Sequence, residues 1–357
     1  MHFVKTEELK TGMRLARPKY NKKSILLFDR NSLLSVQAIE SIRNFGLIGV
    51  YVLEPAEPLP PMTQEDLEFE RFQIKAVSAI EEELDRILKT RKQSRIQTIA
   101  DMVIRNYGHL DEKINFYQNL RSLEDYVSRH SLNVAILCAM ITHVMNIRRE
   151  EQYHTVCAAL LHDMGKLKKH EDVYFGAPYS REDAIRNCET QEEAYSVIED
   201  AFATEGPAIR RICQQAAGKQ LDLFPEEGKE SRYKMLEGSN VLLVANRYDE
   251  ITAMTLQGTA QSEVKAAQEL LEHPEVYDPE TVQALLRSIN ILPPGASVEL
   301  STGEKALVLS ENEENVLCPT VVSFRDNSIL DLALPQNEDI QIVDVMKTMD
   351  NRYILKK

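Results

Sequence analysis

The sequence predicts a mainly α-helical protein with a small α/β domain at its N-terminal end and a small β-rich appendage at its C-terminal end. Three observations predict this fold class. Apolar residues recur at helical spacing through most of residues 94–290, short β-type runs occupy both ends, and prolines at 55–61 and 293–294 mark the two changes. With 357 residues, 43% apolar and 27% charged, the chain has the size and composition of two or three globular domains.

Residues 1–60 are predicted to form the small α/β domain. Short β-type runs lie around residues 3–4, 25–27 and 50–52, and a helical pattern from Val36 ends at Gly46. The prolines that follow form a stiff connector, because proline fixes φ and cannot continue the interior of a helix or a sheet.

Residues 61–93 are predicted to form a charged linker helix with one apolar stripe. The stripe consists of Phe69, Phe72, Val77, Ile80, Leu84 and Ile87. Such a stripe packs on its own protein or pairs with a second copy, since heptad-like stripes also suit coiled coils. The sequence leaves both open, and a homodimer through residues 64–91 is one expectation.

Residues 94–290 form the largest predicted domain, which is almost wholly helical, and residues 291–357 form the β-rich appendage. The candidate helices lie near 94–107, 112–120, 123–146, 150–162, 181–201, 205–217, 232–254 and 261–289. The β-type runs lie at 297–300, 305–309, 320–324 and 340–343, separated by turn formers.

The charge and the cysteines limit the partners and the compartment. A net charge of −14 argues against a surface that binds duplex nucleic acid, because such binding relies on Lys and Arg, although a local basic pocket for a nucleotide stays possible. The five cysteines are widely spaced without a CxxC pair, which indicates reduced thiols and a cytoplasmic protein. No apolar run has the length of a membrane span, and the N-terminus lacks the core of a signal peptide.

The candidate chemistry centres on an adjacent His162-Asp163 pair at the end of an apolar helix. Neighbouring ligands of two types can chelate one metal or bridge two. Gly165 permits a sharp turn of the chain before Lys166. His130 lies 32 residues upstream on the apolar face of another helix. A single histidine on such a face is usually a hydrogen-bonded core residue, but its combination with the His-Asp pair favours a metal ligand.

These residues resemble the HD superfamily of metal-dependent phosphohydrolases, whose minimal pattern is a His, then a His-Asp pair, then a later Asp. The specific resemblance is to the HD-GYP family, whose active members degrade the bacterial messenger cyclic di-GMP, and it covers nearly the whole chain. The stretches that carry it are 129–135, 158–166, 241–249 and 294–304, with 9–16 and 49–52 in the N-terminal part. It implies an HD-superfamily helical domain at residues 94–290 and a role in signal transduction.

The resemblance also implies a metal site made of His130, His162, Asp163 and position 246, where Asn246 replaces the late Asp. Asn246 still has a carbonyl oxygen to offer a hard cation. Asp249, one helical turn onward, is a possible substitute carboxylate.

Asp163 and Lys166 are the catalytic residues that the resemblance implies, with Lys166 matching the family lysine that contacts the substrate phosphate. A solvated lysine at a helix end is the alternative interpretation of Lys166. Gln214 and Gln215 stand where two further family histidines are expected, so a site for two or three metals is incomplete. We therefore expect at most one divalent metal, Mg, Mn or Fe, at reduced occupancy.

Three functions remain open at this point. The first is a degenerate HD-GYP-like signalling protein that binds a cyclic dinucleotide, another nucleotide or a protein partner, with weak or no cyclic di-GMP hydrolysis. The second is an active metal-dependent phosphohydrolase that uses the reduced site. The third is a scaffold in which the residues of the HD pattern have only a structural role, for instance with His162 and Asp163 hydrogen-bonded to each other inside the helical core. Gln214, Gln215 and Asn246 favour binding over turnover.

Overall fold

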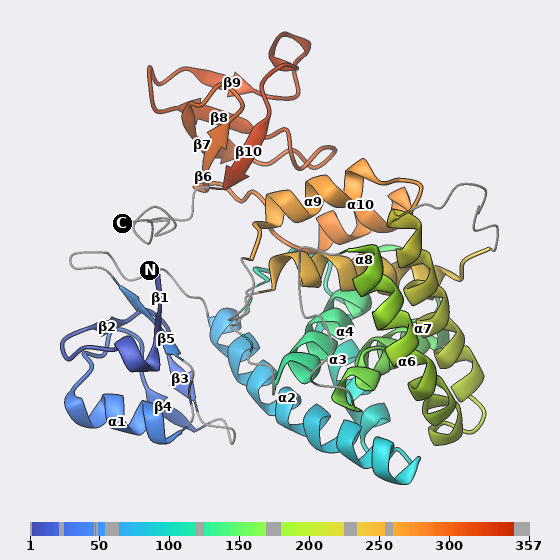
Figure 1. Ribbon diagram of the computed structural model, residues 1–357. Coiled ribbons are helices and arrows are strands. Elements are labelled where there is room, and N and C mark those ends of the chain that lie inside the picture. Colours follow the sequence, from blue (N-terminus) through green and yellow to red (C-terminus); the bar gives the residue numbers. More distant parts are fainter. Residues whose placement is uncertain are drawn as a thin grey trace. The chain divides into compact units, whose positions relative to one another are not determined.

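The structure is a computed structural model, and it describes residues 2–20, 25–45, 47, 49–53, 64–116, 118, 121, 125–168, 180–224, 234–253 and 260–345. The predicted fold class is confirmed, because the protein is mainly helical with small sheets near both ends (Figure 1). Two compact units divide the described residues, one up to Ser78 and one at Ala79–Val345.

The first unit contains a small antiparallel sheet and one helix. The sheet has the order β1 (His2–Lys5), β5 (Gly49–Leu53), β2 (Arg14–Leu15), and a separate ribbon pairs β3 (Lys19–Tyr20) with β4 (Leu26–Phe28). Helix α1 (Val36–Asn44) begins where the Ser35 hydroxyl accepts a hydrogen bond from the Ala38 amide at 3.1 Å. Leu15, Leu34, Ile42, Val50 and Val52 form the core of this unit.

Helix α2 (Gln64–Thr90) carries the apolar stripe predicted from the sequence. Ile80, Leu84 and Ile87 are fully buried within the chain. This part of the stripe therefore packs on its own protein, which was one of the two alternatives. Helix α3 (Ile96–Tyr107) follows after a short turn, in which the buried Glu83 carboxylate accepts the amide of Arg95 at 2.8 Å.

The second unit is a bundle built around α4 (Tyr126–Val144), which packs against α3, α5 (Arg149–Leu161), α8 (Glu237–Thr252) and α10 (Pro279–Ser288) (Figure 1). Residues on nearly all sides of α4 are buried, as expected of a central helix. The 3-10 turn η2 (Met164–Lys168) follows α5, and α6 (Arg181–Ala201) and α7 (Gly206–Gln220) pack as a pair beside α5 and α8.

Two predicted helices differ from the structure. The helix predicted at 112–120 is wrong, because the described residues there are irregular and Ile114 forms a parallel bridge to Ile289. The single helix predicted at 261–289 is two helices, α9 (Glu263–Glu272) and α10. The break follows from local chemistry, since Pro274 cannot continue α9 and the Asp278 carboxylate accepts the Thr281 amide at 2.9 Å to begin α10.

The C-terminal part of the second unit is a five-stranded antiparallel sheet with the order β10 (Ile342–Val345), β6 (Ser297–Leu300), β7 (Lys305–Ser310), β8 (Thr320–Ser323), β9 (Ile329–Asp331). Each of β6, β7 and β8 has two buried residues in alternate positions, beginning at Val298, Ala306 and Val321, as the two-residue period of a strand requires. Strand β9 was not predicted, because only three residues form it.

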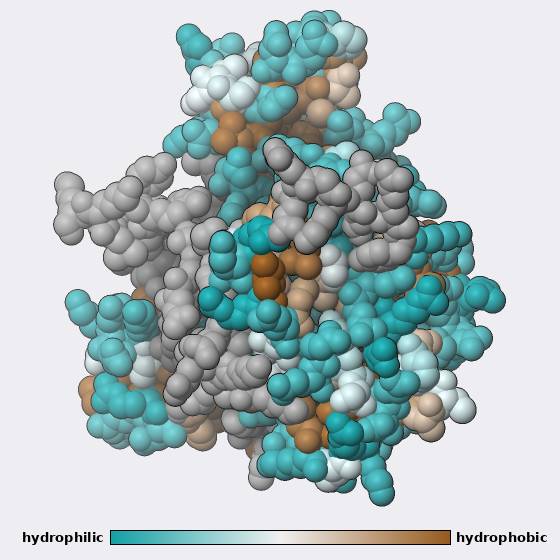
Figure 2. Space-filling model, turned by 45° about the vertical axis from the view of Figure 1, so that its right-hand side comes forward, coloured by the Kyte–Doolittle hydropathy of each residue, from teal (hydrophilic) through white to brown (hydrophobic). Residues whose placement is uncertain are grey.

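The surface matches the charged composition, since hydrophilic residues predominate among the coloured residues of the face that Figure 2 shows. Within the described residues, no helix is long and apolar enough to cross a membrane. All five cysteines are free, and Cys138, Cys157 and Cys213 are buried. Burial raises the pKa of the Cys157 thiol to about 12, which keeps it protonated and unreactive at neutral pH.

Candidate metal centre

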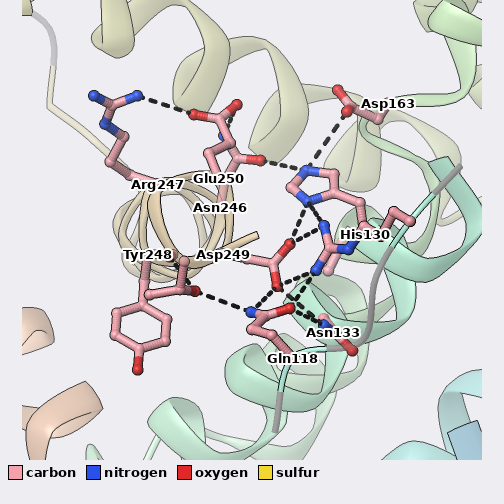
Figure 3. Close-up of polar contacts among 12 residues, drawn as sticks. Gln118, His130, Asn133, Asp163, Asn246, Arg247, Tyr248, Asp249 and Glu250 are labelled. Atoms are coloured by element: carbon pink, nitrogen blue, oxygen red, sulfur yellow. Dashed lines mark hydrogen bonds and ion pairs between the residues drawn. The ribbon is translucent and has the colours of Figure 1, made fainter. Parts of the chain in front are cut away.

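Three helices bring the predicted ligands together. His130 lies on α4, His162 is the C-terminal cap of α5 with Asp163 directly after it, and Asn246 lies on α8. Because α4 packs against both α5 and α8, side chains distant in the sequence meet at one point (Figure 3). His130 is fully buried, and Asp163 and Asn246 are 5% and 8% exposed.

Three of these side chains form what we call the acceptor triangle: His130 Nε2, His162 Nε2 and Asn246 Oδ1. The two ring nitrogens are 3.1 Å apart, and Asn246 Oδ1 lies 2.9 Å from each of them. Asp163 stands beside the triangle, with Oδ2 at 3.5 Å from His130 Nε2 and Oδ1 at 3.9 Å from His162 Nε2.

The hydrogen bonds on the far sides of the two rings assign their tautomers. His130 Nδ1 lies 2.6 Å from the Asp249 carboxylate, and His162 Nδ1 lies 2.8 Å from the Ala159 carbonyl oxygen. Both of these partners only accept hydrogen bonds, and the 2.6 Å contact with Asp249 outweighs the 3.5 Å approach of Arg121 Nη1 to His130 Nδ1. Each ring therefore carries its proton on Nδ1 and directs the lone pair of Nε2 into the triangle. Three lone-pair atoms thus face one another at contact distance, an arrangement that a cation bound between them would stabilise.

The donor set fits a divalent cation. Ligand atoms about 2.1 Å from a six-coordinate ion are roughly 3.0 Å apart when adjacent, and the sides of the acceptor triangle are 2.9–3.1 Å. His130, His162 and Asp163 together form a group able to hold a metal ion. Two imidazoles with oxygen ligands suit Mn²⁺, Fe²⁺ or Zn²⁺ better than Mg²⁺, which prefers oxygen alone.

Asp249 lies behind His130 and not at the triangle. Its two oxygens accept from Arg121 Nη1 and Nη2 at 2.6 and 2.7 Å, from Gln118 Nε2 at 2.8 Å, and from Asn133 Nδ2 at 3.1 Å, in addition to His130 (Figure 3). Asp249, considered above as a substitute ligand, is thus placed to orient His130. Burial acts to raise the pKa of Asp249, but the Arg121 guanidinium and His130 outweigh it and hold that pKa well below its usual range.

Lys166 is buried and paired with the candidate ligand Asp163. Its ammonium is 3% exposed and donates to Asp163 Oδ2 at 2.7 Å, so the alternative of a solvated lysine is wrong. Gln191 Nε2 lies 3.3 Å from the other carboxylate oxygen. Burial acts to raise the pKa of Asp163, but Lys166 and the two histidines outweigh it and keep the carboxylate ionised far below neutral pH.

Gly165 places Asp163 and Lys166 by allowing η2 to approach α6 closely. Its amide donates to Gln191 Oε1 at 2.9 Å. A Cβ at this position would lie 2.4 Å from the carbonyl oxygen of Thr190, closer than any real contact. The glycine therefore serves close packing as well as the chain reversal expected from the sequence.

Gln214 and Gln215 do not face the centre. The Gln215 carbonyl oxygen accepts from the Leu236 amide and the Ser239 hydroxyl, both at 2.9 Å, and so supports the start of α8. Gln214 accepts from Arg210 Nε at 3.1 Å. The side of α7 that lines the cavity beside the centre is instead formed by Cys213, Ala216, Ala217 and Gln220.

That cavity has a volume of about 30 Å³ and is lined in part by His162, Asp163, Lys166, Asn246 and Glu250. Since one water needs roughly 10–15 Å³ of such volume, the space suits an ion with one or two waters. Neither Glu250 nor Gln191 was singled out from the sequence. The spacing of four residues between Asn246 and Glu250 on one helix was the available signal for Glu250.

The fold and the centre define a helical domain in which a His, a His-Asp pair and a late amide surround a candidate cation site. Residues 127–254 match the family model described as HD domain, and the chain therefore carries an HD domain over about a third of its length. The presence of an HD domain supports assignment of the chain to the metal-dependent hydrolases. Searches of curated proteins and of solved structures found no match to this chain.

Proposed function

We propose that this chain is an HD-GYP-like signalling protein whose HD domain holds one divalent cation and binds a phosphate-bearing ligand such as a cyclic dinucleotide, with weak or no hydrolysis of cyclic di-GMP. The ligands in this proposal are His130, His162, Asp163 and Asn246. The acceptor triangle is the observation that carries it, because three lone-pair atoms at contact distance are best explained by a cation between them.

The charges favour one cation over two. Asp163 is the one anionic ligand in the set, and it already shares its charge with Lys166 at 2.7 Å. Within the part of the chain that the structure describes, His130, His162 and Asp163 form the single group of such residues found able to hold a metal. Two-metal hydrolysis needs carboxylates that bridge cations about 4 Å apart, and this set supplies too few.

A bound divalent cation supplies Lewis acidity toward a phosphate oxygen and lowers the pKa of a coordinated water. The chain's own residues supply the rest. The Lys166 ammonium lies at the same cavity and provides positive charge for a phosphate. Asp249 holds His130 in the tautomer whose lone pair faces inward. These features suit binding of an anion more than activation and release of a leaving group.

The two alternatives stand differently against the geometry. An active phosphohydrolase with a reduced site is supported by Asp163 and Lys166, which line the same cavity as His162 and Asn246. In the scaffold alternative, a hydrogen bond between His162 and Asp163 is one example of a structural role, but His162 Nε2 and Asp163 Oδ1 are 3.9 Å apart, which is too long for one.

The test is metal content and ligand binding on the full chain. Protein purified with Mn²⁺ is analysed for bound metal, then titrated with cyclic di-GMP by calorimetry and assayed for turnover. We expect about one metal per chain, lost in His162→Ala and Asp163→Asn. His143→Ala is the matched control, because His143 lies on the same helix as His130 but pairs with Asp111 at 2.9 Å away from the centre.

Absence of bound metal in the wild-type protein contradicts the cation site. Two or more metals per chain with rapid hydrolysis contradict the binding role and support the active phosphohydrolase.

A further inference from the structure

Asn246 poses a problem that an aspartate at the same position would not. A carboxylate presents an acceptor oxygen whichever way it turns, whereas an amide presents either an oxygen or an NH₂ group. Only the orientation with Oδ1 toward His130 and His162 leaves a cation site. Something in the chain must therefore select that orientation.

Glu250 has the contacts needed for this selection (Figure 3). Its Oε1 accepts from Asn246 Nδ2 at 3.2 Å, and its Oε2 accepts from Gln220 Nε2 at 3.0 Å and from Arg247 Nη1 at 3.4 Å. Glu250 is 5% exposed, and Arg247 is itself fixed by Glu269 at 2.7 Å. Every contact made by the carboxylate is to a donor, so Glu250 acts here only as an acceptor.

The opposite orientation of the amide would close the site without any ion. Rotated by half a turn, Asn246 would place Nδ2 about where Oδ1 now lies, 2.9 Å from both imidazole Nε2 atoms. Its two N–H groups would then satisfy both lone pairs. The same rotation would bring Oδ1 against the Glu250 carboxylate, and two acceptors at that distance repel. The carboxylate therefore opposes the closed arrangement.

We propose that Glu250 is a positioning residue that makes the neutral Asn246 a cation ligand by holding its amide nitrogen away from the two histidines. This inference rests on the proposed cation site and adds to it the element that keeps the site open. Asn246 and Glu250 lie four residues apart on α8, so one helical turn carries both the ligand and the group that orients it.

The test is a double-mutant cycle read by calorimetric titration of the chelator-treated full chain with MnCl₂. Glu250→Gln keeps the size of the side chain but offers one acceptor oxygen for three donors, and its new NH₂ group favours the rotated amide. We expect it to weaken Mn²⁺ binding about 10–100-fold, the range measured when partners of metal ligands are removed. In the Asn246→Asp background, the same substitution should not weaken Mn²⁺ binding, because a carboxylate has no wrong orientation and the carboxylate at position 250 that would repel it is removed.

Glu269→Gln is the matched control, since it removes the other acidic partner of Arg247 without touching Asn246. It should leave Mn²⁺ affinity within about two-fold of the wild type, by the same reasoning on partners of ligands. Glu250→Leu removes both oxygens, is expected to give the same pattern, and takes the place of Glu250→Gln if that variant does not fold by circular dichroism.

The outcomes separate the inference from the site on which it rests. Equal losses in the wild-type and Asn246→Asp backgrounds, or no loss in either, overturn the positioning role while leaving the cation site intact. A wild-type protein that takes up no Mn²⁺ overturns the site, and the role of Glu250 falls with it.

Discussion

Replacement of Asp249 by Asn tests the buried network behind the centre. Five donor groups converge on this carboxylate, three on Oδ1 and two on Oδ2. An asparagine offers one oxygen, so at least two buried donors lose their acceptor at about 1–3 kcal/mol each. That sum agrees with the ~3–5 kcal/mol lost when one partner of a buried ion pair is removed. The pair here is Asp249 with Arg121, whose side chain is 1% exposed.

The same substitution should weaken cation binding. The new amide NH₂ donates to His130 Nδ1, which moves the ring proton to Nε2 and places it inside the acceptor triangle. We expect a roughly 10–100-fold loss of Mn²⁺ affinity in addition to the loss of stability. Urea denaturation of chelator-treated protein near neutral pH measures the first effect, and calorimetry with MnCl₂ measures the second.

Asp85→Asn is the matched control for stability. Asp85 pairs with Lys89 at 2.7 Å, a distance close to that of the buried pair, but the two side chains are 60% and 70% exposed. An exposed pair of this kind contributes about 0.3–0.5 kcal/mol. If Asp249→Asn costs no more than this control, or binds Mn²⁺ as the wild type does, the reasoning about the network is refuted.

Three further predictions concern the centre and its surroundings. Burial lowers the pKa of His162 from its ordinary 6.5. The neutral imidazole therefore contributes to the free energy of unfolding of chelator-treated protein above pH 6.5, and this contribution is lost as the pH falls through the folded-state pKa. Urea midpoints measured across this pH range should fall in the wild type and not in His162→Gln. Lys166→Met should raise Mn²⁺ affinity several-fold by calorimetry, because it removes an ammonium 2.7 Å from Asp163, and an unchanged affinity counts against that competition. Gln215→Leu should lower the free energy of unfolding in urea by about 1–3 kcal/mol, because the Leu236 amide and the Ser239 hydroxyl at the start of α8 lose their acceptor. A fall in Mn²⁺ affinity in this variant would instead indicate that Gln215 belongs to the centre.

The helices could be predicted from the sequence where apolar periodicity and a local stop signal agree. Helix α6 has the predicted bounds, and its first residue follows Ser180, whose side chain forms a capping box with Asp183. The predicted helix at 112–120 was wrong because Ile114 and Phe116 are apolar for another reason. Ile114 bridges to a residue after α10, a long-range contact that no local pattern reports.

The candidate ligands could be named from the sequence, whereas the residues that orient them could not. His130, His162, Asp163 and Asn246 belong to stretches with a recognisable order along the chain, and the structure brings all of them to one place. Arg121 falls between the helices predicted at 112–120 and 123–146, so no local pattern in the sequence connects it with Asp249.

The position of Gln214 and Gln215 shows how alignment by motif can miss the geometry of a helix. Residues 213, 216, 217 and 220 of α7 line the cavity, a spacing of three and four that defines one helical side. Residues 214 and 215 fall outside that side. Their side chains are fixed by Arg210 and by the start of α8, so the pair of glutamines has a structural role of its own.

The charges at the centre are those expected of the binding role proposed above. One carboxylate, two neutral imidazoles and one amide give a ligand set with a single negative charge, and the buried ammonium of Lys166 beside Asp163 cancels it. A divalent cation bound there keeps nearly its whole charge for an incoming anion, since little of it is neutralised by the protein. We expect such a centre to attract a phosphate more strongly when the metal is bound. Ligand and metal should therefore bind cooperatively, each raising the affinity for the other by the same factor.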